Sequence, residues 1–325
     1  MKEIEKNLYH LPISLPKSPL GWVNCYLIRG AQRHLLIDTA FNHDECEKSL
    51  LDQLAEIGVA IEDTDIFVTH FHVDHSGLIG RLKRPQNTIY ASAPDKEWIN
   101  SMQNMDHSSW FDDGNLTMGV PDAHKIRAKD HVAHRLKSGG FVDLAVLREG
   151  DRFEIGGFDL RVIDLYGHTP GQIGLWEPDK KYLFCGDHIL NDISPNITAW
   201  DLSTDYLGIY IDSLEKVRSM PVSRLFPAHR DSPPHINERI DWLKEHHHER
   251  SAAIVHILSN SKKPMTAFEV AILLEWSIKG AILEAPLQQL WFACTETLAH
   301  LQSLLFKSNI ARENRDGTLY FLQAL

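Results

Sequence analysis

The sequence has no long apolar segment, no closely spaced cysteines and no surplus of basic residues. No stretch approaches the roughly eighteen to twenty consecutive apolar residues that a membrane-spanning helix needs. The first ten residues, MKEIEKNLYH, are charged and lack the apolar core of a signal peptide. We therefore expect neither a membrane span nor a signal peptide, and a cytoplasmic protein.

The four cysteines, Cys25, Cys46, Cys185 and Cys294, lie far apart and form no Cys-x-x-Cys pair. We expect them to be reduced thiols, as is usual in cytoplasmic proteins. The balance of 33 Lys and Arg against 44 Asp and Glu gives a net charge of -11. Nucleic acid or an anionic membrane would therefore need a local basic patch on this protein.

What the sequence does contain is a long series of alternating strand and helix patterns, ending near residue 230. Hairpins are predicted at 25–38, 152–165 and 173–187, a helix at 45–58, and strands at 64–72 and 222–229. From residue 233 the pattern becomes helical, at 235–260, 266–276 and 287–305, before a hairpin about Asp316-Gly317. This predicts a catalytic domain of residues 1–232 with an inserted segment at about 98–145. A winged-helix-like domain of residues 233–325 would follow.

One motif concentrates metal-binding side chains. In VTHFHVDHSGL, His70, His72, Asp74 and His75 fall within six positions directly after an apolar strand pattern. Two histidines separated by one residue point to the same side of an extended chain, so both can reach one ion. Because packing alone has no use for four desolvated polar groups, we interpret the motif as a metal site.

Three other predicted strands end at a metal-binding residue. His168 follows VIDLYG, Asp187 follows YLFCG and His229 follows LFPA. Strands that end at the same edge of the fold would bring these side chains to the first motif. Five histidines and two aspartates are too many for one tetrahedral ion, but they suffice for two ions with one bridging carboxylate.

These motifs, HFHVDH, GHTPG, GD after an apolar strand and PAH, resemble the metallo-β-lactamase-fold superfamily over roughly residues 8–232. The resemblance implies an α+β fold, an αββα sandwich with the site at one edge. It also implies roles for individual residues. His70, His72 and His168 would bind the first metal, Asp74, His75 and His229 the second, Asp187 would bridge, and Asp38 would support the ligand loop.

The implied chemistry is that of a binuclear metal-dependent hydrolase. Two divalent ions, zinc first and iron or manganese as alternatives, would share a hydroxide that attacks the substrate. Asp74 would bind metal and also carry the proton to the leaving group. No serine or cysteine nucleophile is needed.

The GHTPG and GDH motifs resemble glyoxalase II-like enzymes, which favours a carboxylic thioester or ester as substrate. The C-terminal region instead resembles lactamase-like proteins with a winged-helix domain, so an endoribonuclease or phosphodiesterase remains an alternative, as does a lactonase. Residues 233–325 carry nine Lys and Arg against ten Asp and Glu, and the third helix offers only Lys307. A nucleic-acid-reading helix needs a basic stripe, so we expect a packing or dimerisation module, with a homodimer left open. A metal-stabilised binding protein without activity is the non-enzymatic alternative.

The substrate itself is expected to be a small acyl compound. The inserted segment contains an apolar set that would form either its own core or a lid over the substrate: Trp98, Met102, Met105, Trp110, Phe111 and Met118. Candidate substrate contacts are Trp22, Trp110, Phe111 and His188, although His188 is equally a candidate neighbour of the metal ligand Asp187. His107 is the inserted histidine that we expect nearest the site, while His124, His131, His134 and the run His246–His248 are expected to be solvated.

Overall fold

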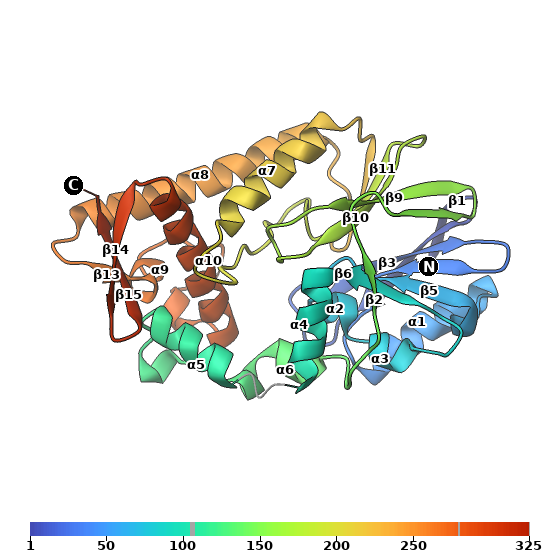
Figure 1. Cartoon of the computed structure of the whole chain (residues 1–325), viewed down its shortest axis with the longest axis horizontal. Coiled ribbons are helices and arrows are strands. Elements are labelled where there is room, and N and C mark those ends of the chain that lie inside the picture. Colours follow the sequence, from blue (N-terminus) through green and yellow to red (C-terminus); the bar gives the residue numbers. More distant parts are fainter. Residues whose placement is uncertain (105–107, 279, 325) are drawn as a thin grey trace. The chain divides into compact units, whose positions relative to one another are not determined.

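The computed structural model describes residues 1–104, 108–278 and 280–324 of the chain. Two compact units are present (Figure 1). The described residues of 1–105, 135–195 and 213–239 form the first unit, and those of 106–134, 196–212 and 240–325 form the second.

A seven-stranded sheet forms one half of the first unit. Its strands lie in chain order: β1 (Lys2–Glu5), β2 (Leu8–Ser14), β3 (Trp22–Arg29), β4 (His34–Ile37), β5 (Thr64–Phe67), β6 (Ile89–Ser92) and β7 (Ala145–Leu147). The first four strands pair antiparallel, and β4 to β7 pair in parallel. Parallel strands end at a common edge of the sheet, so the residues after β4, β5 and β6 emerge together.

The other half is a five-stranded sheet in the order β12-β11-β10-β9-β8. Its strands are β8 (Arg152–Ile155), β9 (Phe158–Asp164), β10 (Ile173–Glu177), β11 (Tyr182–Gly186) and β12 (Arg224–Pro227). The turn between β8 and β9 contains Gly156 and Gly157, both at positive φ, as the predicted hairpin requires. Because β11 and β12 are parallel and β10 runs opposite to both β9 and β11, the strands β9, β11 and β12 end at one edge.

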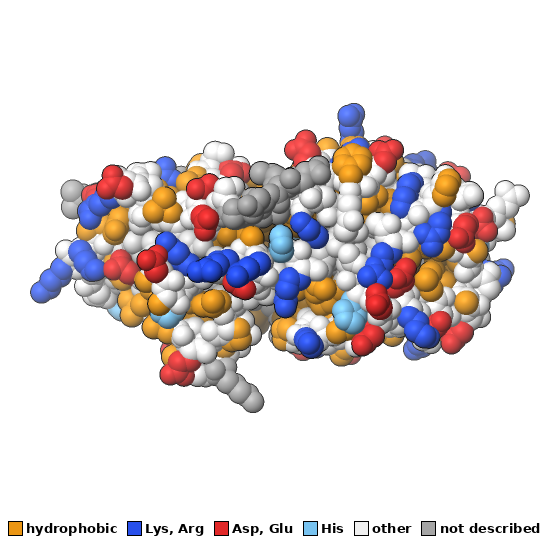
Figure 2. All heavy atoms as spheres, turned by 90° about the horizontal axis from the view of Figure 1, so that it is seen from below, with side chains coloured by type: hydrophobic (Ala, Val, Ile, Leu, Met, Phe, Trp, Pro, Cys, Tyr) orange, Lys and Arg blue, Asp and Glu red, His pale blue; other side chains and the backbone are white. Residues whose placement is uncertain are grey.

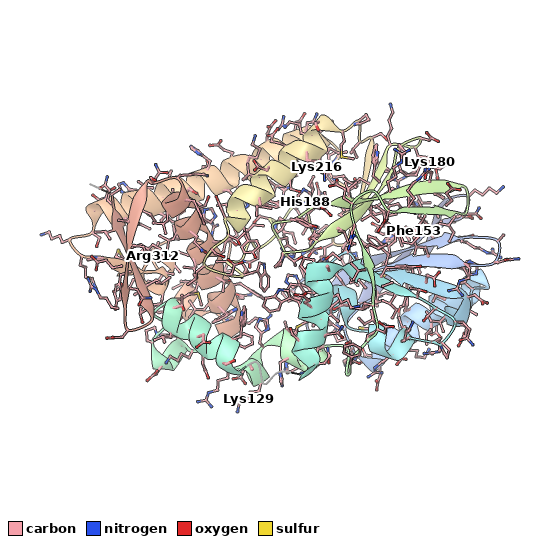
Figure 3. The ribbon with its side chains drawn as sticks, in the orientation of Figure 1. Lys129, Phe153, Lys180, His188, Lys216 and Arg312 are labelled. Carbon is pink, nitrogen blue, oxygen red and sulfur yellow. The ribbon has the colours of Figure 1, made fainter. Side chains whose placement is uncertain are left out.

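The two sheets pack face to face through an apolar core. Buried residues of both sheets, such as Ile37, Phe67, Leu160 and Phe184, belong to one cluster. Phe153, labelled in Figure 3, has its ring 6.3 Å from that of Phe67 across this interface.

Helices cover the outer faces of both sheets. Helix α1 (Asp44–Ile57) buries Cys46, Leu50, Leu54 and Ile57 and packs on β2, and it ends at Gly58 in the left-handed conformation. Lys216 of α7 (Tyr206–Ser219) donates to the backbone oxygen of Asp164 at the end of β9. The other helices described before residue 235 are α2 (Val73–Ser76), α3 (Ile79–Leu82), α4 (Ala93–Asn104), α6 (Val132–Leu136) and α5 (Ser108–Thr117), of which α5 belongs to the second unit. This is the αββα sandwich that the sequence predicted.

The second unit is mainly helical. It contains α8 (Ile236–Asn260), β13 (Met265–Thr266), α9 (Ala267–Ala271), α10 (Leu287–Phe306), β14 (Ile310–Arg315) and β15 (Thr318–Gln323), with the sheet order β13-β15-β14. Short 3-10 turns occur at Ile61–Asp63, Asp122–His124, Ala128–Asp130 and Ile282–Glu284. The predicted helix at 266–276 is shorter than expected, because its first residue pairs with β15 and the helix ends at residue 271.

The division into units differs from the predicted boundary at residue 233. Phe111, Met118 and Ile126 of the inserted segment are buried in the same core as Trp291 and Leu298 of α10. Side chains that share a core fold as one unit, so the middle of the insertion belongs with the C-terminal helices. Core formation is therefore the role of Phe111 and Met118.

The sequence predicted no membrane-spanning helix, and it predicted reduced cysteines. Among the described residues, no helix has both the length and the apolar character that crossing a membrane requires. All four cysteines are free and buried in this structure.

Gly77, at the end of α2, offers a test of this packing. A Cβ atom at this position would lie 2.6 Å from the backbone oxygen of Ala40 and 2.6 Å from the backbone nitrogen of Asn42. We expect Gly77→Ala to lower the free energy of unfolding by at least about 2 kcal/mol, because backbone atoms must shift. Denaturant titration followed by circular dichroism measures this.

Gly140→Ala is the matched control, because an added Cβ there would meet no heavy atom of the described residues within 4 Å. Equal stability of the two variants would contradict the close approach at Gly77.

Candidate metal centre

The seven predicted metal-binding side chains come together in the first unit. Each lies in the short segment after a strand: His70 to His75 after β5, His168 after β9, Asp187 after β11 and His229 after β12. Because these strands end at one edge of the sandwich, residues up to 159 positions apart in the sequence become neighbours. Six of these residues are buried, and His72 is partly buried.

Three histidines form the first group. The Nδ1 atom of His72 lies 3.1 Å from Nε2 of His70 and 3.0 Å from Nε2 of His168. Nitrogen atoms this close together around one point suit the imidazole ligands of one transition-metal ion.

Asp74, His75 and His229 form the second group. Asp74 Oδ2 lies 3.3 Å from His229 Nε2, and Asp74 Oδ1 lies 3.7 Å from His75 Nε2. Asp187 stands between the groups, since its carboxylate oxygens lie 3.8 Å from His168 Nε2, 3.6 Å from His75 Nε2 and 3.6 Å from His229 Nε2. This is the place that a bridging carboxylate would occupy.

Asp38 supports the second group. Its side chain accepts from the backbone N–H of Thr69 at 2.7 Å and from the Thr69 hydroxyl at 2.8 Å, and Oδ2 lies 2.9 Å from His75 Nδ1. Asp38 itself has φ of 60°, a left-handed conformation that is uncommon for residues other than glycine. The bond to Nδ1 orients the imidazole so that Nε2 faces the other ligands, which is the usual arrangement behind a metal-binding histidine.

Asp95, which the sequence reading missed, supports the first group. Its Oδ2 atom accepts from the backbone N–H of Phe71 at 2.9 Å and from the hydroxyl of Thr169 at 2.9 Å. These residues adjoin the candidate ligands His70 and His168, so one carboxylate ties both ligand-bearing loops together. Burial raises the pKa of Asp95 to about 7, although both hydrogen bonds oppose this shift. The position of Asp95 in the sequence could have indicated its role. It comes shortly after the strand pattern IYAS, just as the candidate ligands come shortly after other strands.

Trp98, one helical turn after Asp95 on α4, stacks on the ring of Phe71 with ring centroids 5.3 Å apart. Helix α4 thus holds Phe71 by its backbone through Asp95 and by its side chain through Trp98.

Asn24, also missed, holds the loop that carries His229. Its amide nitrogen donates to the backbone oxygens of Pro227 at 3.0 Å and Arg230 at 2.8 Å. His229 Nδ1 lies 2.9 Å from the backbone oxygen of Trp22, which orients this imidazole. Asn24 and Pro227 are 203 residues apart in the sequence, so no local sequence pattern predicts their contact.

The ionisation of the imidazoles differs between the two groups, because nearby carboxylates outweigh burial and raise the pKa of His75 and His229. Burial lowers the pKa of His70 well below its usual value and that of His72 to about 3, and neighbouring imidazoles add to both shifts. Burial opposes ionisation of Asp74, but His75 and His229 outweigh it and lower its pKa to about 2.

Three buried atoms also point to a bound group. His75 Nε2, His229 Nε2 and Asp187 Oδ1 are inaccessible and make no hydrogen bond of acceptable geometry with the described residues. Buried polar atoms without partners are costly, and imidazole nitrogens together with carboxylate oxygens are the donor set that divalent metals take. The residues of this cluster therefore fit bound divalent metal ions.

The predicted substrate contacts in the first unit differ in their exposure to solvent. Trp22 is 39% exposed, and its indole N–H donates to Asn24 Oδ1 at 2.9 Å. His188 is fully buried beside α7, with Nε2 3.4 Å from the Ser213 hydroxyl, and burial lowers its pKa to about 3 (Figure 3). In this structure the imidazole of His188 therefore contacts α7, and its contact with a substrate stays a prediction.

In the second unit, Trp110 is partly buried and stacks with Trp200 at 6.1 Å, whereas Phe111 is 5% exposed and leaves almost no surface for a substrate. His107 and Met105 lie outside the described residues. His131, expected to be solvated, is 8% exposed and its ring contacts Phe111.

The expectation of a solvated run at His246–His248 is wrong for His247. Only His248 is exposed, because His247 faces α10, where its Nδ1 lies 3.2 Å from His300 Nε2. His246, His247 and Glu296 come close enough together to hold an ion. Arg250 Nη1, however, lies 3.4 Å from Glu296 Oε1 and already supplies a positive charge, so we assign no metal there.

Comparison with known proteins shows which family has a similar sequence. A family profile described as the metallo-beta-lactamase superfamily matches residues 19–229, which is more than half of the chain. The probable metallo-hydrolase YqjP of Bacillus subtilis (strain 168) is 26% identical over 311 residues, covering 93% of this chain and 93% of that protein. The acyl-coenzyme A thioesterase MBLAC2 of Bos taurus is 24% identical over 212 residues, covering 63% of this chain and 72% of that protein.

Among solved structures, a metallo-beta-lactamase family protein from Thermus thermophilus, TTHA1429, has a TM-score of 0.82 at 25% identity. The match covers 99% of this chain and 100% of that chain. The similarity therefore extends beyond the residues that the family profile matches.

The contacts of Asp95 lead to a prediction about metal affinity. Asp95→Ala removes the acceptor for Phe71 N–H and the Thr169 hydroxyl, so His70, His72 and His168 lose their common support. We expect metal affinity at the first group to fall by roughly 10–100-fold. Titration of chelator-treated protein with zinc, in competition with an indicator, measures this affinity.

Asp95→Asn keeps an acceptor oxygen and should lose less affinity than Asp95→Ala. Asp52→Ala, at an exposed carboxylate on α1, controls for the loss of one negative charge. Unchanged zinc affinity in Asp95→Ala would show that Asp95 does not support the site.

Proposed function

The chain belongs to the metallo-beta-lactamase superfamily and is a hydrolase, and we propose that it hydrolyses a carboxylic thioester or ester with two bound divalent metal ions. The observation that carries this proposal is the convergence of five histidines and two aspartates in one cluster, in which all but the partly buried His72 are buried. His70, His72 and His168 would hold one ion, Asp74, His75 and His229 the other, and Asp187 would bridge them. Metal-dependent hydrolysis of this kind suits the relative named as an acyl-coenzyme A thioesterase.

The metal ions, with zinc proposed first, would supply an activated water and polarise the substrate carbonyl. Imidazole and carboxylate ligands accept iron and manganese as well, so these are the alternative metals.

The pKa values of the cysteine thiols support a reaction in which water, and not a cysteine, is the nucleophile. Burial raises the pKa of Cys46 to about 11 and the pKa of Cys185 and Cys294 to about 12, and it raises the pKa of Cys25 as well. Thiols with such pKa values are poor nucleophiles at neutral pH. A route through a covalent cysteine intermediate is therefore disfavoured.

Asp74 is the proposed proton carrier. It is 9% exposed, whereas His70, His75 and His229 have no exposed surface, so Asp74 is among the candidate ligands that a substrate can approach. Its low pKa keeps it ionised at neutral pH, so it is free to take up a proton during the reaction, and because it is a weak base it would pass that proton on readily to the leaving group.

The second unit argues against a long nucleic acid as substrate. We propose that its order of helix, strand, two helices and hairpin makes it winged-helix-like, so that α10 would correspond to the helix that reads DNA in such domains. In this chain 14 of the 20 residues of α10 are buried, so the helix offers no free face for a groove. Figure 2 also shows Lys and Arg side chains intermingled with Asp and Glu on one face of the molecule. A small acyl substrate fits these features better than RNA does.

A substrate panel tests the reaction class. We expect the zinc-loaded protein to hydrolyse thioesters, with a fall of at least about 100-fold in kcat for Asp74→Asn, because the carboxylate and its proton transfer are lost together. Release of free thiol, followed with a chromogenic disulfide, measures the rate. Raising the ionic strength should change the rate on a neutral thioester little, whereas RNA cleavage should fall steeply.

Asp63→Asn, at an exposed carboxylate in the 3-10 turn before β5, should behave as the unmodified protein. The proposal fails if the protein cleaves RNA or phosphodiesters and leaves every thioester and ester untouched. Activity on lactones alone would favour the lactonase alternative.

A further inference from the structure

The residue after His229 has an unusual backbone conformation. Arg230 has φ of 63°, in the left-handed region that L-amino acid side chains seldom adopt. Asn24 stabilises it there by donating to its backbone oxygen at 2.8 Å. Glycine would fit this conformation without strain, so the presence of arginine points to a use for its side chain.

The guanidinium of Arg230 lies beside Trp22. Its central carbon is 5.7 Å from the centroid of the Trp22 ring, and Nη1 donates to the backbone oxygen of Leu20 at 3.3 Å. The indole is itself fixed by its N–H bond to Asn24, and the backbone oxygen of Trp22 orients the imidazole of His229. A cation and an aromatic ring therefore both adjoin one candidate metal ligand.

The existing contacts leave much of the guanidinium's binding capacity unused. Its ion pair with Asp192 joins Nε and Oδ1 at 3.5 Å, and the Asp192 side chain is 61% exposed. Nε makes no hydrogen bond of acceptable geometry within the described part of the chain, and the side chain of Arg230 remains 27% exposed. A planar guanidinium with N–H groups to spare is suited to bind a carboxylate or phosphate through two parallel hydrogen bonds.

We infer that Arg230 and Trp22 form a subsite for an anionic group of the substrate, a carboxylate or a phosphate, next to the second group of candidate ligands. The inference rests on the proposed thioester or ester hydrolysis. Because the chain carries a net charge of -11, an anionic substrate is repelled by the molecule as a whole and requires a local cation. Arg230 provides that cation one residue from His229, and the Trp22 ring covers one side of it. Asp192 is then the competing counter-ion that the substrate anion displaces.

Three thioesters with the same acyl chain length test the inference. The first is uncharged, an acyl N-acetylcysteamine; the second carries a carboxylate at the far end of the acyl group; the third carries phosphates on the thiol, an acyl-coenzyme A. Arg230→Gly removes the guanidinium and retains a residue that tolerates positive φ. We expect it to raise KM for one charged thioester about tenfold or more relative to the uncharged one, because a charge-assisted hydrogen bond is lost.

Asp192→Asn should shift the same ratio in the opposite direction, because it removes the competing carboxylate. Arg152→Gln, at an exposed arginine on β8, is the matched control for loss of one positive charge. The charged thioester that responds identifies the source of the anion, the acyl part or the thiol part.

A binding measurement separates this inference from the reaction itself. Calorimetric titration of chelator-treated protein with coenzyme A and with a dicarboxylate should show weaker binding of one of them to Arg230→Gly, by about tenfold. If Arg230→Gly changes neither the KM ratio nor this affinity, the subsite does not exist. If no thioester is hydrolysed by the unmodified protein, the proposed reaction fails, and the titration alone then decides the subsite.

Discussion

The arrangement of the candidate site depends most on the buried carboxylate of Asp38. This one side chain accepts hydrogen bonds from the backbone N–H and the hydroxyl of Thr69, and it also lies beside Nδ1 of His75. It therefore joins the end of β4 to the turn that carries four candidate ligands. The β-strands alone would bring that turn to the edge of the sandwich without orienting any imidazole. Asp95 and Asn24 fix the loops of His168 and His229 in the same way, so each group of candidate ligands is held by at least one buried polar side chain.

Burial of the candidate ligands lowers the stability of the folded state, and this links folding to metal binding. The carboxylates and imidazoles of the cluster are desolvated, and without a bound cation the charge of Asp74 is offset only by protonation of the neighbouring His75 and His229. Cations bound only by the folded chain would offset this cost and stabilise the folded state by mass action. The buried thiols and the apolar core between the two sheets provide no comparable coupling, because their environment is the same with or without an ion.

The sequence was sufficient to predict the parts of the site that follow from local pattern. A motif such as HFHVDH and a ligand-type residue after an apolar strand can be recognised without tertiary information, and so can the alternation that produces the sandwich. Asn24 could not be found in this way, since its partner Pro227 lies 203 positions away and no local pattern links the two. The burial of His247 and the assignment of Phe111 to the second core were also beyond local pattern, because both depend on which face of a helix meets α10.

The order of the candidate ligands along the chain has a consequence for the newly made protein. His70, His72 and His168 are all synthesised before Asp187 and His229, and the last of them precedes His229 by about sixty residues. At roughly 5–20 residues per second, a ribosome takes some seconds to cover that distance. During this interval the three histidines of the first group have been made, and Asp187 follows His168 by 19 residues, but the second group still lacks His229. The all-histidine first group is therefore complete in the chain before the second group is, and three imidazole ligands would favour zinc over manganese there.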